Sequence, residues 1–250
     1  GYGTELGRNI TGSVAVIDSE VIENRNLTSV GQALAGTAPG VQVSQGSGEP
    51  GNDSLFISIR GVGTLNNSSP LVIVDGVEGN LNNLNPQDIE SISVLKDAAS
   101  SAIYGSRAAN GVIVVKTKRG GKSQPTKFTY DASFATSKLL FDFDQISFDP
   151  IENVNWKNQV DVGNGAAGRW SADQISFINA NKANWLGSNG QTPVDVTIQD
   201  ASLQQHTFAA TGGSEKTNYR ISVGLLDQTG NTRDGMNFKR ANFRINLDSQ

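Results

Sequence analysis

The sequence predicts an α+β domain followed by antiparallel strands of the length and alternation found in a transmembrane β-barrel. Two observations support this fold class. In the first half of the 250-residue chain, short runs of Val and Ile lie between many of the 28 glycines, which is typical of short strands joined by tight turns. After Pro125, apolar and polar residues alternate over about the 9 to 11 positions that a tilted strand needs to cross a bilayer.

The composition excludes several other classes of protein. With 36% hydrophobic and 18% charged residues, the chain is too apolar for a disordered tail, and no run approaches the roughly 18 apolar residues of a spanning helix. A formal net charge of -4 argues against a nucleic-acid partner. The sequence has no Cys and one His, His206, so it is poorly equipped for a metal site or a catalytic triad. We therefore expect no catalytic residues, no metal and no cofactor.

Apolar runs bounded by turn residues predict short strands in the first half. These strands are residues 13–18, 41–44, 55–60, 71–74, 89–95 and 112–118. The dipeptide Asp75-Gly76 follows the fourth strand and predicts a two-residue hairpin. Capping residues predict short helices between the strands. The expected helices run from a cap at Thr28 to Leu34, from Asn85 through Pro86, and from Asp97 to Tyr104 ahead of Gly105.

Beyond residue 125, aromatic and aliphatic side chains occupy every second position of three predicted strands. They are Phe128, Tyr130, Ala132 and Phe134, then Tyr219, Ile221, Val223 and Leu225, then Phe243, Ile245 and Leu247. A weaker strand, residues 206–212, pairs with the second of these through the short turn 213–217. In a membrane barrel these apolar side chains point away from the lumen, whereas a soluble sandwich buries them under a second sheet.

The connections between these strands are long, then short, then of medium length. The long connection, residues 138–204, is polar and carries Trp156, Trp170 and Trp185, which could stack on sugars or pack locally. Outer-membrane barrels alternate long outer loops with short periplasmic turns, and a soluble sandwich can show a similar alternation. Four strands cannot close a membrane barrel, so the membrane interpretation places most of the barrel beyond Gln250.

Several motifs carry a resemblance to a known family. The motifs are ISIRGVGT at residues 57–64, PLVIVDGVEG at 70–79, NPQDIESISVLKDAASSAIYGSRAANGVIVVKTKRG at 85–120 and GGSEKTNYRISVGLLDQTGN at 212–231. Together and in this order they resemble the plug domain and first barrel strands of TonB-dependent outer-membrane transporters, in the SusC-like branch of nutrient importers. The resemblance implies a plug domain at residues 1–122. It implies the first strands and first extracellular loop of an incomplete barrel of about 22 strands at residues 123–250.

The resemblance also implies a function and partners. Such a receptor binds a nutrient, an oligosaccharide or a peptide, at the outer face of the bacterial outer membrane. It imports the nutrient through a plug-gated barrel powered by the TonB system. The implied partners are a TonB-type energy-coupling protein, bound through a segment upstream of Gly1, a SusD-like surface lipoprotein, and outer-membrane lipid. The alternative is a soluble or secreted interaction module that binds protein or glycan and has no transport role.

Candidate site residues lie at the end of the third predicted strand. The loop 61–69 offers Asn66, Asn67, Ser68 and Ser69 as hydrogen-bonding groups for a sugar or a peptide, and we expect it to face the ligand. Arg60 precedes the loop and could anchor the plug to a carboxylate, with an ion pair inside the plug favoured over a substrate contact. Turn formation and capping account for the acidic residues Asp75, Glu78 and Asp97 better than a metal or acid/base cluster does.

Overall fold

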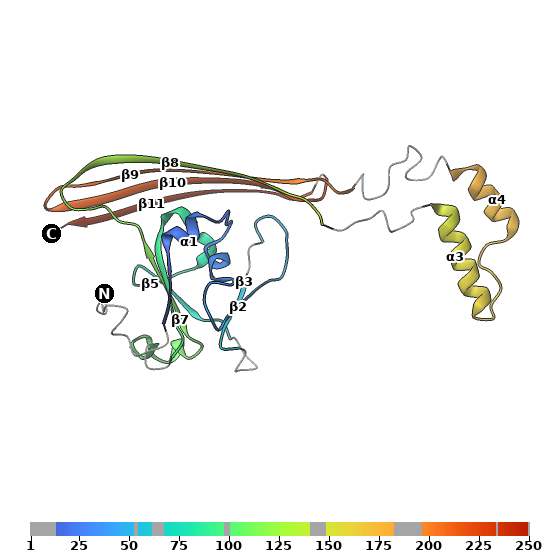
Figure 1. The fold of residues 1–250 in the computed structure, drawn as a ribbon, viewed down its shortest axis with the longest axis horizontal. Coiled ribbons are helices and arrows are strands. Elements are labelled where there is room, and N and C mark those ends of the chain that lie inside the picture. The colour runs from blue at the N-terminus through green and yellow to red at the C-terminus, as the bar shows by residue number, and fades with distance from the viewer. Residues whose placement is uncertain are drawn as a thin grey trace. The chain divides into compact units, whose positions relative to one another are not determined.

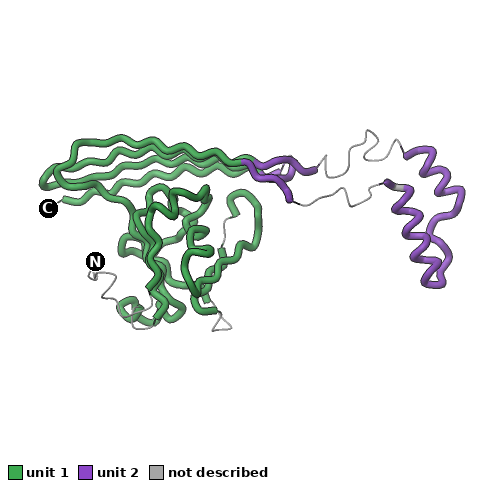
Figure 2. The backbone as a smooth tube through the Cα atoms, viewed as in Figure 1, with its two compact units in different colours: residues 1–135, 202–229, 237–250 green, residues 136–201, 230–236 purple. Residues whose placement is uncertain are grey.

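The computed structural model describes residues 14–52, 55–61, 68–97, 101–140, 149–182, 197–233 and 235–249 of the chain. The chain forms two compact units (Figure 2). The first comprises residues 1–135, 202–229 and 237–250, and holds the α+β domain with most of the long strands. The second comprises residues 136–201 and 230–236, which are mainly the long connection between two of those strands.

The α+β domain is built on a five-stranded sheet of order β1-β6-β7-β4-β5 (Figure 1). Its strands are β1 (Val14–Asp18), β4 (Leu71–Val74), β5 (Val77–Glu78), β6 (Ile89–Leu95) and β7 (Val112–Thr117). Strands β4 and β7 are parallel and the other neighbours are antiparallel. A separate antiparallel pair consists of β2 (Val41–Gln45) and β3 (Leu55–Ile59). The six strands predicted from the sequence are all present, and the Asp75-Gly76 turn joins β4 to β5 as expected.

The short helices differ from prediction in two places. Helix η2 (Val30–Leu34) is capped by Ser29 rather than Thr28, because the Ser29 side chain accepts from the Gly31 backbone N–H. Within η5 (Ala102–Ala108), Gly105 has a non-helical backbone with a φ of 70° and divides the element into two short helices, as the stop predicted there requires. Helix α1 (Ser19–Glu23) was not predicted.

Two other short helices complete the domain, η3 (Leu81–Asn83) and η4 (Pro86–Asp88). The cap predicted at Asn85 is confirmed, since its side chain accepts from the Gln87 backbone N–H. The start of the helix expected after Asp97 falls on residues 98–100, outside the described residues.

A single apolar cluster forms most of the core of this domain. Its most deeply buried members come from α1, η2 and one face of the sheet: Ile22, Leu34, Ile89, Ile92 and Ile113. Each such side chain contributes about 1.5–3 kcal/mol relative to exposure. The core therefore ties α1 and η2 to β6 and β7, and its member Ile89 directly follows η4.

Four long strands form a second, antiparallel sheet of order β11-β10-β9-β8 (Figure 1). They are β8 (Gln124–Ser137), β9 (Ala201–Gly213), β10 (Thr217–Thr229) and β11 (Asn237–Ser249). Strand β9 is longer than the weak strand predicted at 206–212. The short turn after it is confirmed, with the Ser214 backbone N–H donating to the Thr217 carbonyl. Strands β7 and β8 belong to different sheets, and the domain boundary after residue 122 stays a prediction.

The two faces of the long sheet differ sharply in character. The alternating apolar side chains are exposed, with Phe128, Phe134 and Phe243 at 65%, 65% and 68% exposure, and Tyr219 is half-buried. The intervening side chains, such as Thr207 and Ser222, are buried against the α+β domain. In the described part of the chain, no second sheet covers the apolar face, as a sandwich would require.

The second unit contains two helices that the sequence did not predict. Helix α3 (Pro150–Gly163) is capped by Asp149, and α4 (Ala172–Ala180) begins at a capping box formed by Ser171 and Gln174. Trp170 follows α3 and its backbone is held by Asn158, while Trp185 lies outside the described residues. Among the helices that the structure describes, none is long and apolar enough to cross a membrane.

Candidate functional site

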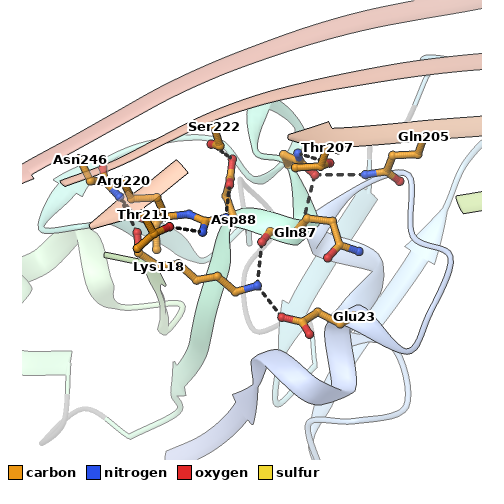
Figure 3. Close-up of polar contacts among 12 residues, drawn as sticks. Glu23, Gln87, Asp88, Lys118, Gln205, Thr207, Thr211, Arg220, Ser222 and Asn246 are labelled. Atoms are coloured by element: carbon orange, nitrogen blue, oxygen red, sulfur yellow. Dashed lines mark hydrogen bonds and ion pairs between the residues drawn. The ribbon is translucent and has the colours of Figure 1, made fainter. Parts of the chain in front are cut away.

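The candidate site is the interface between the α+β domain and the long sheet, which we call the polar interface. It is formed by η4 and neighbouring residues of the α+β domain and by inward-facing side chains of β9, β10 and β11 (Figure 3). Hydrogen bonds and ion pairs dominate it. The polar side chains at every second position of the long strands therefore have a structural role, because they contact the α+β domain.

Asp88, the last residue of η4, lies at the centre of the polar interface. Its Oδ1 accepts from Arg220 Nη2 at 3.1 Å and its Oδ2 accepts from Ser222 Oγ at 2.8 Å. Arg220 also donates through Nη1 to Thr211 Oγ1 at 3.1 Å. The Asp88 and Arg220 side chains are only 4% and 10% exposed. A buried charge needs a partner, so each of these residues depends on the other for a tolerable environment.

Asn85 starts η4 and also binds the wall of long strands. Its Oδ1 accepts from the Gln87 backbone N–H and from Gln205 Nε2, each at 3.1 Å, and its Nδ2 donates to Thr207 Oγ1 at 3.0 Å. Gly224 of β10 allows this close approach, since a Cβ at that position would collide with the Asn85 amide. One side chain therefore sets the local fold of η4 and its attachment to β9.

Strand β11 presents polar side chains at alternate positions to the α+β domain. Two of them bind backbone carbonyls: Arg240 donates to Asn82 O at 3.0 Å, and Asn242 donates to Asn83 O at 2.9 Å. The next two bind the turn after β4 and strand β7. Arg244 pairs with Asp75 at 3.3 Å, and Asn246 donates to Thr117 Oγ1 at 2.9 Å. Arg240 also reaches the Thr28 carbonyl at 2.8 Å. The result is a continuous line of attachment along one strand.

Asp75 has a second role besides the predicted turn. Its φ of 50° is the left-handed conformation that the hairpin needs. Its carboxylate accepts from the Thr117 backbone N–H at 3.0 Å and from Thr117 Oγ1 at 2.7 Å, in addition to the ion pair with Arg244. The turn explanation from the sequence was therefore incomplete, because this carboxylate also binds the long sheet.

Lys118 connects two parts of the α+β domain beneath the polar interface (Figure 3). Its Nζ forms an ion pair with Glu23 at the end of α1 and donates to the Gln87 carbonyl of η4 at 2.8 Å. It therefore couples the position of α1 to the turn that carries Asp88.

Of the predicted site residues, the structure describes Arg60, Ser68 and Ser69. Arg60, with a φ of 60° and a side chain 57% exposed, pairs with Asp97 of the same domain. Ser68 is buried at 7% exposure, and Ser69 is exposed. Asn66 and Asn67 lie outside the described residues. The binding role of residues 66–69 and the anchoring role of Arg60 stay predictions.

The sequence interpretation missed the residues that hold the two sheets together. Asp88 and Asn85 lie in a segment read only as a capped turn, and their partners lie more than a hundred residues away. A usable signal was present. Arg220, Ser222 and Arg244 lie on the polar face of the predicted strands. A charged side chain that is buried on such a face requires a partner, so the sequence indicated that another part of the chain packs there.

Comparison with known proteins gives a family for this architecture. Residues 7–112 match the model of the TonB-dependent receptor plug domain. TonB-dependent receptor P26 of Formosa agariphila is 35% identical over 253 residues, covering 99% of this chain and 24% of the relative. TonB-dependent receptor SusC of Bacteroides thetaiotaomicron is 33% identical over 261 residues, covering 99% of this chain and 24% of the relative. The chain thus spans about a quarter of the length of these relatives.

Solved structures agree with this result. The RagAB peptide importer in its "open-open" state matches with a TM-score of 0.82 and 30% identity, covering 100% of this chain and 30% of that chain. The siderophore receptor PirA of Pseudomonas aeruginosa matches with a TM-score of 0.55 at 18% identity, which shows the shared fold alone.

An α+β domain bound through polar side chains to one face of long antiparallel strands is the arrangement of a plug held against a barrel wall. The chain belongs to the TonB-dependent receptor family, in its SusC-like branch. The α+β domain is the plug, and the long sheet is part of the barrel wall.

Proposed function

We propose that this chain is the plug and first wall strands of an outer-membrane active-transport receptor. The receptor binds a nutrient, an oligosaccharide or a peptide, at the outer face and imports it through the plug-gated barrel, powered by a TonB-type energy-coupling protein. The observation that carries this proposal is the two-sided wall. One face is an exposed apolar band and the other binds the plug through hydrogen bonds and ion pairs.

The apolar band supports a membrane location. Ile221, Val223 and Leu225 of β10 are aligned with Ile245, Phe243 and Ala241 of β11. A band of aligned apolar rows on the outside of tilted strands suits contact with lipid acyl chains. In a soluble interaction module this apolar surface would be exposed to water, which is unfavourable in free energy. No observation on the described residues favours that alternative.

The polar interface supports gating. A hydrogen bond inside a protein contributes only about 0.5–1.5 kcal/mol net, because water replaces the lost partner when the groups separate. A plug held by such bonds can therefore move into a water-filled lumen at moderate cost. If the interface were apolar, each movement of the plug would expose apolar surface to water, which costs free energy.

The relatives support the proposed substrates and partners. One similar structure is titled a peptide importer and one relative is SusC, so a peptide or an oligosaccharide is the proposed cargo. A SusD-like surface lipoprotein and a coupling protein that engages a segment upstream of Gly1 are the proposed partners. The relatives are named receptors and importers, and we propose no catalytic activity. Asn66, Asn67, Ser68 and Ser69 are the proposed ligand contacts.

Uptake by the complete receptor tests this function. The receptor is produced in a bacterial strain with its coupling protein and in the same strain without it, and labelled oligosaccharides and peptides are supplied. We expect the receptor to fractionate with the outer membrane and to take up one of these classes only when the coupling protein is present. Equal uptake in both strains, or a soluble receptor, would contradict the proposal.

A further inference from the structure

The plug is attached unevenly to the four wall strands. Strand β10 holds it through the buried Asp88–Arg220 pair, and β11 holds it along its whole inner face. On β8, by contrast, the side chains of the described residues make one hydrogen bond to the plug, from Ser133 Oγ to Asn26 Oδ1 at 2.6 Å. Asn26 is exposed and Ser133 is half-buried.

A cavity of about 390 Å³ lies on the β8 side of the plug. Its plug wall includes Glu23, Asn26 and Gln87, and its barrel wall is formed by residues of both β8 and β9, among them Ser133 and Thr207. Polar and charged side chains outnumber apolar ones in the lining, so the cavity suits water and a hydrogen-bonding solute. The single β8 hydrogen bond lies among these residues.

The part of the plug nearest the N-terminus borders this cavity. Among the strands that the structure describes, β1 is an edge strand that pairs with β6 alone, and α1 follows it directly. Glu23 of α1 and Asn26 beyond it line the cavity. The half-exposed pair between Glu23 and Lys118 joins α1 to the region of the plug that is fixed to β10 and β11.

The cost of separation differs between the two sides. Moving the plug away from β10 and β11 breaks the buried Asp88–Arg220 pair, the Ser222 bond to Asp88 and the row of side-chain attachments along β11 together. Moving it away from β8 breaks one exposed hydrogen bond that water can replace.

We propose that the plug remains fixed to β10 and β11 during import and separates from the wall along β8. The cavity beside α1 then widens into the passage for the polar substrate. This inference rests on the proposed transport function.

Paired cysteine substitutions test the proposed side of opening. Asn26→Cys with Ser133→Cys links the plug to β8, and Thr117→Cys with Asn246→Cys links it to β11. Each pair replaces a hydrogen bond between a hydroxyl and a side-chain amide, at 2.6 and 2.9 Å. The β11 pair also removes the bonds from Thr117 to Asp75 and from Asn246 to the Lys118 carbonyl, so each crosslinked form is compared with its own reduced form. The chain itself contains no cysteine. Coupler-dependent uptake is measured in the complete receptor before and after reduction, with each crosslink verified by mass spectrometry.

We expect the β8 crosslink to abolish uptake and reduction to restore it, whereas the β11 crosslink leaves uptake at the level of its reduced form. Uptake through the β8-linked receptor, or loss of uptake on linking β11, would overturn the inference. The proposed function has a separate readout. It fails if the reduced variants and the unsubstituted receptor all lack coupler-dependent uptake while they are assembled in the outer membrane.

A second measurement needs no crosslink. Asn26→Cys and Thr117→Cys are made singly, and reaction with a water-soluble thiol reagent is followed in cells with and without substrate and coupling protein. We expect turnover to increase the labelling rate at position 26 and to leave position 117 protected. Increased labelling at position 117 with an unchanged rate at position 26 would overturn the inference.

Discussion

Asp88 Oδ1 of the plug lies 3.1 Å from Arg220 Nη2 of the wall, and the two side chains form a buried ion pair. Ser222 donates to the second carboxylate oxygen, so both oxygens of Asp88 bind β10. Arg220 Nε has no hydrogen-bond partner in the described structure, which leaves the guanidinium dependent on Asp88 and Thr211. A pair of this kind holds strongly while intact and is costly to break from one side.

Removing the Asp88 carboxylate should loosen the plug. Asp88→Ala leaves Arg220 as an uncompensated buried charge, and we expect attachment of the plug to weaken by about 3–5 kcal/mol. Hydrogen exchange of η4 and β6 in the complete receptor and leakage of small solutes into liposomes measure the effect. Glu90→Ala is the control, because it removes the exposed pair with Lys116, which is worth about 0–1 kcal/mol. Equal effects of the two substitutions would contradict the assignment.

The double replacement separates charge from packing. Asp88→Leu with Arg220→Met removes both charges and leaves apolar groups in their place. We expect the leak of the double variant to be smaller than that of Asp88→Ala, because no unpaired charge remains. A double variant that leaks as much as Asp88→Ala would show that the geometry of the bonds to Ser222 and Thr211, and not the unpaired charge, sets the cost.

Adding one methyl group at Gly224 should displace η4. A Cβ at this position collides with the Asn85 amide, which cannot move without losing its bonds to Thr207 and Gln205. We expect Gly224→Ala to destabilise the seated plug by about 1–3 kcal/mol, as overpacking of a filled site does. Gly48→Ala is the control, since its Cβ meets nothing within 4 Å. The hydrogen-exchange rate of η4 decides the outcome, and an unchanged rate in Gly224→Ala would contradict the tight contact.

Two substitutions of Asp75 distinguish its turn role from its wall contact. Asparagine tolerates the left-handed backbone at a φ of 50° and keeps an acceptor for Thr117, but it loses the charge that pairs with Arg244. Alanine loses the acceptors as well and adds a backbone cost of about 1–2 kcal/mol. We therefore expect Asp75→Ala to raise exchange in β7 more than Asp75→Asn does. Equal exchange in the two variants would show that the ion pair with Arg244 alone accounts for the contribution of Asp75.

The sequence predicted the elements of this chain better than their contacts. Strand β11 illustrates the difference. The alternation of apolar and polar residues showed which of its side chains share a face, because successive side chains of a strand point to opposite faces. The partners of Arg240 and Asn246 in the plug could not be predicted, since the chain returns to them after more than a hundred residues.

Local competition explains one of the smaller misses. Thr28 and Ser29 are adjacent candidates for the same cap. The structure uses Ser29 because Thr28 instead bonds the Gln32 side chain. At Gly105 the predicted stop is present, but a further helical segment follows it that the sequence interpretation did not include.

Placing a charge in the apolar band tests its contact with lipid. Val223 lies in the middle of the band, in register with Phe243 of β11 and Phe208 of β9. We expect Val223→Arg to reduce the free energy of assembly into bilayers by about 2–4 kcal/mol. Thr229→Arg, at the end of the same strand and outside the band, should cost far less. Folding of the complete receptor into lipid vesicles, titrated with urea, measures both, and equal costs would argue against lipid contact.

The predicted ligand loop requires a test that separates binding from plug attachment. Asn66→Ala with Asn67→Ala removes two sets of hydrogen-bonding groups. We expect weaker equilibrium binding of the transported substrate, by about 0.5–1.5 kcal/mol for each hydrogen bond lost, with no added solute leak. Arg60→Ala should leave affinity unchanged and raise the leak less than Asp88→Ala does, because its half-exposed pair with Asp97 is worth about 0–1 kcal/mol. Unchanged affinity in the double Asn variant would exclude this loop from the binding site and confine recognition to the extracellular loops of the barrel.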